Sequence, residues 1–267
     1  MRFTSETTSN GVSERLFLLD DIPGALWAPA DAPADRPLVL LSHGGGQHKK
    51  APGVAARAHR YVQAGGFTVA AIDAPGHGDR ARTEEDEQFT AGIRQRLAAG
   101  EPINAEIDRN NARRAARAVP EWQATLDALQ ELDDIGEGGP VGFWGVSLGC
   151  AIGVPFAAAE PRITAAIFGL AANDTLAEAA ARVTVPVEFL PQWDDELVPR
   201  QSGLALFDAF GSRQKTLHAN PGGHTSVPAF ELESSERFFA RHLVEGGASV
   251  TAGSPSGRRL LVRNGSI

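Results

Sequence analysis

Ser147 lies in a sequence context that is typical of a nucleophilic serine. It is the centre of the sequence GVSLG over residues 145–149, where an apolar run gives way to a helix-like segment. Glycines two positions either side permit a sharp turn that exposes the hydroxyl, and the start of the next helix favours negative charge nearby. We predict that Ser147 attacks a substrate. The competing interpretation is a glycine-rich turn with an incidental serine.

A histidine that could take the proton from this hydroxyl follows the last predicted strand. His224 ends the sequence NPGGH over residues 220–224, so it lies in a loop that glycines make adaptable. A single histidine in such a loop is more often structural. His224 gains weight because the chain presents a serine, then acidic residues, then this histidine, in the order expected of a serine hydrolase with a strand-to-helix nucleophile turn.

The acid that would orient the base has several candidates. The sequence WDDELVP over residues 193–199 follows a predicted buried strand and contains three carboxylates. Asp195 fits best because the Val-Pro that comes after it can begin the next helix. Asp194 is the second choice and Glu196 the third, while Asp174, after the preceding strand, stays open. In this interpretation Asp195 holds the imidazole in the required tautomer while His224 acts as general base.

Backbone amides that could stabilise an oxyanion are expected in two places. One is the N–H of Leu148, directly after the proposed nucleophile. The other lies in the sequence SHGGGQ over residues 42–47, where Gly45 is the first choice and Gly44 or Gly46 are alternatives. The histidine of this loop, His43, ends a strand and is expected to make a structural hydrogen bond.

An unusually long connection over residues 81–119 is predicted to form a helical lid. Phe89 begins an apolar stripe that recurs every four residues, which suits a helix resting on a pocket. Phe89, Gln47 and Trp193 are the side chains proposed to line that pocket. The lid arginines, of which Arg114 is one, are interpreted as solvated surface; the alternative is that one of them meets a substrate carboxylate.

The elements that would position these residues alternate between strand and helix. This alternation predicts an α/β fold with a mostly parallel, twisted sheet, helices on both faces and right-handed crossovers. Ligands of such sheets gather at the carboxyl ends of the strands. The expected strands are 13–19, 22–28, 37–42, 67–72, 140–146, 163–169, 185–191 and 214–219, and the expected helices are 53–64, 120–132, 148–159, 175–182, 200–210 and 228–244.

The chain length of 267 residues fits one such domain. We expect a single domain over 1–246 with the lid insert at 81–119, followed by a tail, 247–267. The tail is rich in Gly and Ser, and residues 258–263 within it could form an edge strand.

Composition and charge exclude several classes of function. The net charge of −8 disfavours nucleic acid as a partner, because phosphates would be repelled. The beginning of the sequence has no signal-like apolar run, and no membrane span is evident, so a cytoplasmic protein is expected. The single cysteine, Cys150, rules out an intramolecular disulfide or a cysteine-based metal site. We expect neither metal nor cofactor, and the oligomeric state stays open.

These motifs resemble the α/β-hydrolase superfamily, and within it the esterases related to dienelactone hydrolases and prolyl oligopeptidases. The resemblance covers about residues 12–244 and rests on HGGG (43–46), DAPGHG (73–78), GVSLG (145–149), DELVP (195–199) and GGH (222–224). It implies a serine hydrolase in which His77 stabilises its loop. The sequence departs from dienelactone hydrolases, which use a cysteine nucleophile, because Ser147 occupies the nucleophile position; Cys150 lies one helical turn beyond it.

The resulting prediction is a carboxylic-ester hydrolase for a small or medium acyl substrate. The same residues would serve a thioesterase, lactonase or amidase, and sequence does not separate these. A non-hydrolytic role for the fold, as an isomerase, a cyclase or a binding protein, is the alternative from another class.

Overall fold

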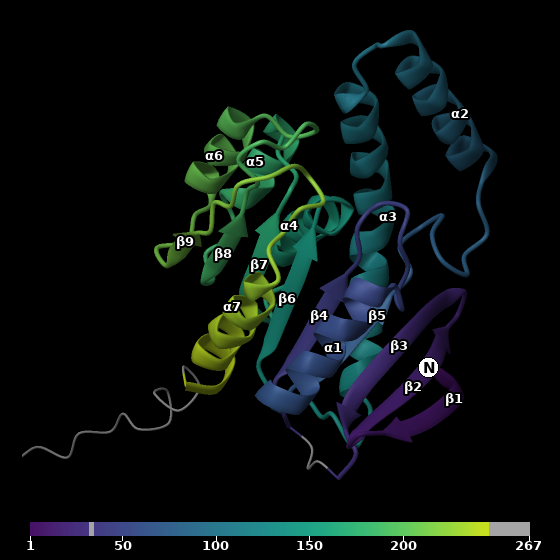
Figure 1. The fold of residues 1–267 in the computed structure, drawn as a ribbon. Helices are drawn as coiled ribbons and strands as arrows, with labels where there is room; N and C mark the ends of the chain where they lie inside the picture. The colour runs from purple at the N-terminus through teal and green to yellow at the C-terminus, as the bar shows by residue number, and fades with distance from the viewer. Residues whose placement is uncertain (32–34, 246–267) are drawn as a thin grey trace, which may run out of the picture.

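A single mixed sheet organises the part of the chain that the computed structural model describes, residues 1–31 and 35–245. Its strand order is β1-β2-β3-β5-β4-β6-β7-β8-β9, in which β1 to β3 and β5 pair antiparallel and all later pairs are parallel. Figure 1 shows the sheet twisting through the body of the molecule. The strands are β1 (Arg2–Ser9), β2 (Val12–Leu19), β3 (Ile22–Pro29), β4 (Leu38–Ser42), β5 (Thr68–Ile72), β6 (Val141–Val146), β7 (Ile163–Gly169), β8 (Val187–Leu190) and β9 (Lys215–Leu217).

The central strands are apolar throughout because both faces of the sheet are covered. Every residue of β4 is buried, and its side chains alternate between two cores. Leu38 and Leu40 belong to one core, and Val39 and Leu41 to the other. This is the period-two alternation of a strand between two layers of helices.

Helices lie on both faces of the sheet, as Figure 1 shows. One core is completed by α1 (Pro52–Gly65) and α7 (Phe230–Phe239), which continues as a wider, π-helical turn, η1 (Ala240–Glu245). The other is completed by α3 (Asn104–Gln130), α4 (Leu148–Ala159), α5 (Asp174–Ala180) and α6 (Arg200–Ala209). The arrangement confirms the predicted fold class.

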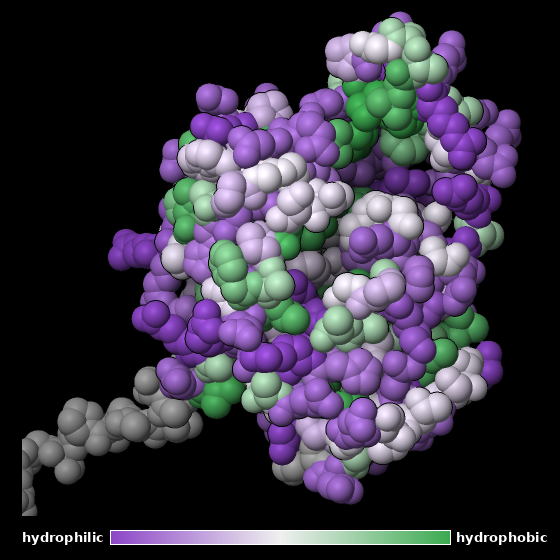
Figure 2. Space-filling model, in the orientation of Figure 1, coloured by the Kyte–Doolittle hydropathy of each residue, from purple (hydrophilic) through white to green (hydrophobic). Residues whose placement is uncertain are grey.

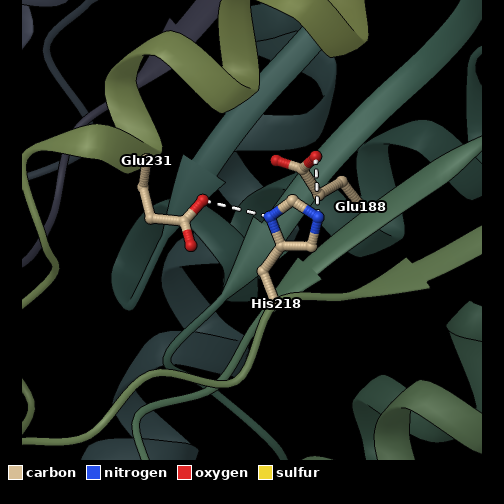
Figure 3. A group of neighbouring side chains, drawn as sticks. All are labelled: Glu188, His218 and Glu231. Carbon is tan, nitrogen blue, oxygen red and sulfur yellow. Dashed lines mark hydrogen bonds and ion pairs between the residues drawn. The ribbon is translucent and has the colours of Figure 1, made fainter.

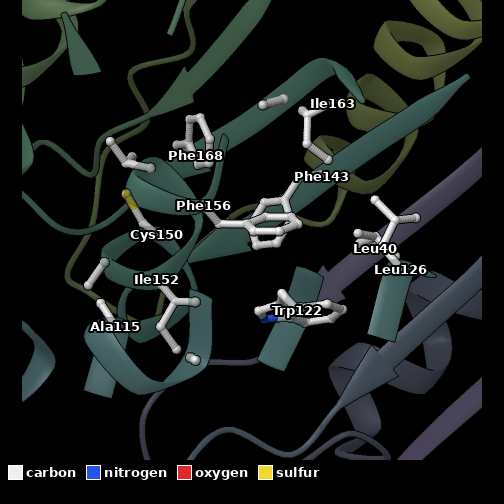
Figure 4. Packing of buried hydrophobic residues seen from close by; sticks show 14 of the residues in the cluster. Leu40, Ala115, Trp122, Leu126, Phe143, Cys150, Ile152, Phe156, Ile163 and Phe168 are labelled. Atoms are coloured by element: carbon white, nitrogen blue, oxygen red, sulfur yellow. The ribbon is translucent and has the colours of Figure 1, made fainter. Parts of the chain in front are cut away.

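Aromatic residues hold α3 and α4 against the sheet. Trp122 of α3 meets Phe143 of β6 edge-on, with ring centroids 5.8 Å apart, and Phe156 of α4 lies 5.5 Å from Phe143 (Figure 4). All three are buried, so dense packing anchors α3 and α4 against β6.

The segment between β5 and β6 forms a helical hairpin that projects beyond the sheet (Figure 1). Its first helix, α2 (Glu84–Ala99), begins with a capping box in which Thr83 and Asp86 bond each other's backbone N–H. It ends at Gly100, whose φ of 68° suits glycine. The second arm is the first half of α3. Both arms are helical, as the sequence predicts for 81–119.

The predicted boundary of a helix at residue 120 is wrong. A single helix runs from Asn104 to Gln130 with Pro120 inside it. Proline normally ends a helix because it lacks an N–H and crowds the preceding turn. Here Ala115 and Ala118 before it and Trp122 after it are all buried against the same core, and this packing keeps the helix continuous.

One further difference lies at the start of the chain. Strand β1, which the sequence did not predict, is exposed and pairs with β2 alone at the edge of the sheet. The edge strand proposed for 258–263 lies outside the described residues, as does the tail 247–267. Among the residues the structure describes, no helix is both long and apolar enough to cross a membrane.

Candidate active site

The turn between β6 and α4 holds Ser147 in a backbone conformation that few residues adopt. Its φ is 56° and its ψ −120°. The turn is closed by two glycines: a Cβ on Gly145 would lie 2.4 Å from the carbonyl oxygen of Gly149, and one on Gly149 would lie 2.4 Å from that of Ser42. Neither position has room for a side chain. This explains the spacing of the glycines and why the serine is presented at the carboxyl end of the strand.

Ser147, His224 and Asp195 form a chain of hydrogen bonds. Nδ1 of His224 lies 2.8 Å from Asp195 Oδ2 and 3.0 Å from Oδ1, and its Nε2 lies 2.9 Å from Ser147 Oγ. Because a carboxylate only accepts, Nδ1 carries the proton, and Nε2 is left free to accept from the serine hydroxyl. The side chain of Asp195 is 2% exposed and that of His224 is 12% exposed, so the hydrogen bond between them is largely shielded from solvent.

Each of the three carboxylates in the turn over residues 193–199 has different hydrogen-bond partners. Asp195 Oδ1 also accepts from the backbone N–H groups of Leu197 (2.8 Å) and Val198 (2.9 Å), which fixes its orientation. Asp194 accepts from the N–H of Gly222 at 3.0 Å, and Glu196 from the N–H of His224 at 3.0 Å. These last two bonds hold the histidine loop rather than the imidazole.

The fourth candidate acid, Asp174, begins α5, and its contacts do not include the imidazole in the described residues. Glu196 is occupied elsewhere, since its carboxyl accepts from the backbone N–H of His224, and this hydrogen bond lowers the pKa of Glu196. Of the four candidates, Asp195 is therefore the one placed beside the ring.

The glycine loop after β4 is a tight turn held by a neutral histidine. Gln47 N–H donates to Gly44 O at 3.2 Å, and Gly46 has a φ of 74°, as the third position of a type II turn requires. His43 Nε2 accepts from the N–H of Ala74 at 3.1 Å, so Nδ1 carries the proton and donates to Gly44 O at 2.8 Å. Burial lowers the pKa of His43 to about 4, which keeps the ring neutral. These are the structural hydrogen bonds expected of His43.

A buried ion pair fastens this loop to the loop after β5. Lys49 Nζ lies 2.8 Å from Asp73 and 2.6 Å from Asp79, and the N–H of Lys49 donates to Asp73 at 2.7 Å. Burial disfavours the ammonium, but the hydrogen bonds to the two aspartates outweigh it and raise the pKa of Lys49. The loop carrying Gly45 is therefore rigid at its far end, while at Gly45 itself a Cβ would meet nothing within 4 Å. Gly46 is equally open, and neither glycine lines the cavity above Ser147, so this openness does not single out Gly45.

A cavity of about 280 Å³ opens above Ser147 and His224. Its walls come from α3, from the turn after Asp195 and from the loop after β7. Asn104 Nδ2 donates to Leu197 O at 2.8 Å, and Asn173 Nδ2 donates to Asp108 at 3.1 Å. These two bonds tie the hairpin to the rim of the cavity.

A larger hollow of about 700 Å³ continues from the cavity between α3, α4 and α5. The two spaces share Asp108, Asn111, Asn173 and Asp174. Ser147 and His224 line only the smaller one, so we place the candidate site there. Figure 2 shows apolar side chains gathered between the two arms of the hairpin, and Leu97 of α2 is 59% exposed.

The three pocket residues proposed from the sequence do not line this cavity. Gln47 is exposed on the glycine turn. Phe89 lies under the guanidinium of Arg114, 5.5 Å from the ring centroid, and Trp193 lies similarly under Arg200 at 4.4 Å.

The cavity contains polar residues that the sequence analysis missed. Asn104, Asn111 and Asn173 line it, and they are spaced too widely along the chain to form a recognisable motif.

Two of the lid arginines form ion pairs with acidic residues of the hairpin. Arg114 pairs with the buried Asp86 at 2.8 Å, and Arg109 pairs with Glu106. The carboxylate of Asp86 also packs against Gly76, where a Cβ would lie 2.6 Å from it. The ion pair therefore attaches the hairpin to the loop after β5.

The chain was compared with known proteins. Residues 38–261 match the model of the alpha/beta hydrolase family. A PEG-bound structure of a cold-adapted esterase from an Arctic intertidal metagenomic library is 36% identical, with a TM-score of 0.73, and the match covers 91% of this chain and 100% of that one. The search of curated proteins found no match.

Two more distant structures show the same fold. Acetyl xylan esterase 1 from Thermoanaerobacterium sp. JW/SL YS485 is 15% identical with a TM-score of 0.66, over 90% of this chain and 87% of that one. Est1E from Butyrivibrio proteoclasticus, solved with ferulic acid, is 18% identical with a TM-score of 0.63, over 85% and 98%.

Proposed function

This chain belongs to the alpha/beta hydrolase family, and we propose that it is a serine carboxylic-ester hydrolase that acts on a small or medium acyl substrate. The observation that carries the proposal is the hydrogen-bond chain from Asp195 through His224 to Ser147, at 2.8 and 2.9 Å. The structure that is 36% identical to this chain is that of an esterase, which supports ester bonds as the target.

In the proposed mechanism His224 Nε2 takes the proton of Ser147 as the hydroxyl oxygen attacks the acyl carbonyl. Asp195 keeps the Nδ1 proton in place and stabilises the imidazolium that forms. The imidazolium then gives its proton to the leaving alcohol, which leaves an acyl group on Ser147. Water, deprotonated by the same imidazole, hydrolyses this acyl-enzyme and regenerates the serine.

The negative charge that develops on the carbonyl oxygen needs two donors. The N–H of Leu148 is one, since the first amides of a helix have no acceptor within that helix. The N–H of Gly45 is the other, on a loop held by His43 and Lys49. Each such donor typically contributes about 3 kcal/mol to the transition state.

The cavity favours a neutral substrate of modest size. Its described lining includes Asp108 and Asp174 but no lysine or arginine. These two aspartates would repel a substrate carboxylate, whereas the lid arginine Arg109 lines only the adjoining larger hollow. The hairpin of α2 and α3 acts as a lid in this proposal, because Asn104, Ile107 and Asn111 of α3 form one wall of the cavity.

A substrate panel tests the proposal. Wild type and Ser147→Ala would be assayed on p-nitrophenyl acetate, butyrate and octanoate, on an acyl thioester, a lactone and an anilide, and on a matched ester that bears a carboxylate. We expect the short neutral esters to be turned over fastest, the acid-bearing ester slower, and Ser147→Ala to be inactive. Turnover of the thioester, lactone or anilide above every ester would reassign the reaction. Absence of all hydrolysis would favour a non-hydrolytic role.

A further inference from the structure

A second cluster of ionisable side chains lies outside the candidate site, where the connection from β9 to α7 that carries His224 begins and ends. Glu188 comes from β8, His218 follows β9, and Glu231 lies in the first turn of α7 (Figure 3). His218 Nδ1 is 3.1 Å from Glu231, and Nε2 is 3.5 Å from Glu188. Figure 3 shows the imidazole between the two carboxylates.

The side chains of Glu188 and Glu231 are more deeply buried than acidic side chains in proteins usually are. The side chain of Glu188 is 4% exposed and that of Glu231 2% exposed. Glu231 is partly satisfied, since Asn220 Nδ2 donates to its Oε1 at 2.8 Å. Glu188 Oε1 is buried and has no hydrogen-bond partner among the described residues. An unpartnered carboxylate oxygen in this setting carries a large desolvation penalty, which a bound cation would remove.

The surrounding charges do not remove this deficit. The charged groups near Glu188 are His218, Arg57, Arg237 and Glu231, and none of them hydrogen-bonds its Oε1. Arg57 directs its Nη1 to Ser235 and Tyr61. The cluster therefore places two buried carboxylates against one imidazole, with one carboxylate oxygen left without a partner among the described residues.

We propose that Glu188, His218 and Glu231 bind a divalent transition-metal cation of the zinc type. One imidazole nitrogen and one oxygen from each carboxylate already lie within 4.8 Å of one another. Zinc takes such ligands at about 2.0–2.2 Å and binds three protein groups with solvent in a fourth position. Because Nδ1 faces Glu231 and Nε2 faces Glu188, the imidazole would turn on binding, so that one of its nitrogens and both carboxylates point to the same ion. Magnesium and calcium fit less well, because they require six or more oxygen ligands.

The place of the cluster gives the ion a consequence. His218 precedes His224 in the connection from β9 to α7, and Glu231 follows it. An ion bound to both residues and to Glu188 of β8 would fasten the two ends of this loop to the sheet. The proposed ion would hold the backbone that presents the imidazole and would not touch the substrate.

The experiment measures binding directly. The full chain is stripped with EDTA, returned to metal-free buffer and titrated with ZnCl₂ by calorimetry, and its thermal unfolding is followed with and without zinc. The variants are Glu188→Gln and His218→Asn, with Glu233→Gln as the control. Glu233 lies on the same helix but is 56% exposed. Thermal midpoints without metal show whether each variant folds, and Glu231→Gln replaces any that does not.

We expect one zinc per chain and a thermal midpoint raised by roughly 5–10 °C at a hundredfold excess over Kd. Affinity should fall by about 100-fold or more in Glu188→Gln and His218→Asn, since even outer-shell partners of a metal contribute 10–100-fold. It should be unchanged in Glu233→Gln. Absence of binding to wild type, or equal affinity in Glu188→Gln, would overturn the proposal. So would loss of the site in His224→Ala, which would place the ion at the candidate active site instead.

Discussion

Replacing Asp195 by asparagine isolates the role of the acid because it changes one atom and leaves the shape of the side chain unchanged. Asp195 Oδ1 accepts from the N–H groups of Leu197 and Val198, so an asparagine would keep its carbonyl oxygen there. Its NH₂ would take the place of Oδ2, which lies 2.8 Å from His224 Nδ1. Two donors cannot share that contact, and the oxygen kept at Oδ1, 3.0 Å from Nδ1, already accepts from two backbone N–H groups, so we expect Nδ1 to become the acceptor of the new amide.

The consequence at Ser147 follows from the tautomer. With Nδ1 accepting, the proton of the imidazole moves to Nε2, which lies 2.9 Å from Ser147 Oγ. The ring can then no longer take the serine proton. The same change in an established serine protease lowers turnover by about 10⁴-fold, or about 5 kcal/mol of transition-state stabilisation. We expect a loss of that size in kcat for Asp195→Asn.

The assay is hydrolysis of p-nitrophenyl acetate, with thermal unfolding to show that the variant is folded. Asp194→Asn is the matched control, because Asp194 accepts from the N–H of Gly222, which an amide oxygen can also do, and its only ion-pair partner among the described residues is the half-exposed Arg200 at 3.9 Å. Its activity should stay near that of wild type. Near-normal turnover by Asp195→Asn, or an equal loss in Asp194→Asn, would refute the assignment of the acid.

Four other predictions follow from contacts around the site. Lys49→Met should destabilise the fold by about 3–5 kcal/mol in urea unfolding, because it leaves a fully buried aspartate without its counter-ion; a loss below 1 kcal/mol would show that the ion pair does not hold the glycine loop. The pKa of His43 is lowered to about 4, so its contribution to stability is complete above pH 6.5 and is lost as pH falls toward 4. The loss should be about 3 kcal/mol, and the difference between wild type and His43→Asn should follow it; a pH-independent difference would contradict it. Glu188 has the opposite effect on stability: burial raises its pKa to about 7, so its contribution makes the protein less stable as pH rises. Because Glu188 is present in both proteins, this effect cancels in the difference between wild type and His43→Asn. Asn104→Ala removes the 2.8 Å bond to the turn after Asp195 and should lower kcat/KM about fivefold, whereas unchanged kinetics would show that the lid does not need this tie. Cys150, whose pKa burial raises to about 12, should resist iodoacetamide at pH 8 in the native protein and react once in denaturant; rapid native labelling would contradict its burial.

The parts of the fold that the sequence predicted are those with strong local signals. Helix 148–159 and strand 163–169 have the predicted bounds, because a continuous apolar strand and a small-residue helix are both legible from consecutive residues. The placement of Ser147 at a strand-helix junction was accessible for the same reason. The choice of Asp195 among neighbouring acids rested on where the next helix begins, which is also a local signal.

The parts that the sequence could not predict depend on contacts between distant segments. Pro120 would end most helices, and only burial of Ala118 and Trp122 on either side keeps α3 continuous. Strand β1 is polar and exposed, so it lacks the alternation that indicates a strand.

The polar groups around the cavity and the second cluster were invisible for the same reason. Asn104 and Asn173 meet at the cavity only because α3 crosses the carboxyl edge of the sheet. Glu188, His218 and Glu231 come from three elements and have no common motif.

The central claim is that Ser147 is the nucleophile, and covalent labelling tests it most directly. Wild type and Ser147→Ala would be treated with a fluorophosphonate, weighed intact by mass spectrometry, and digested to locate the adduct. We expect one adduct per chain, on the peptide that contains Ser147, and none on the variant. An adduct that persists in Ser147→Ala, or a wild-type protein that hydrolyses esters but takes up no label, would contradict the account.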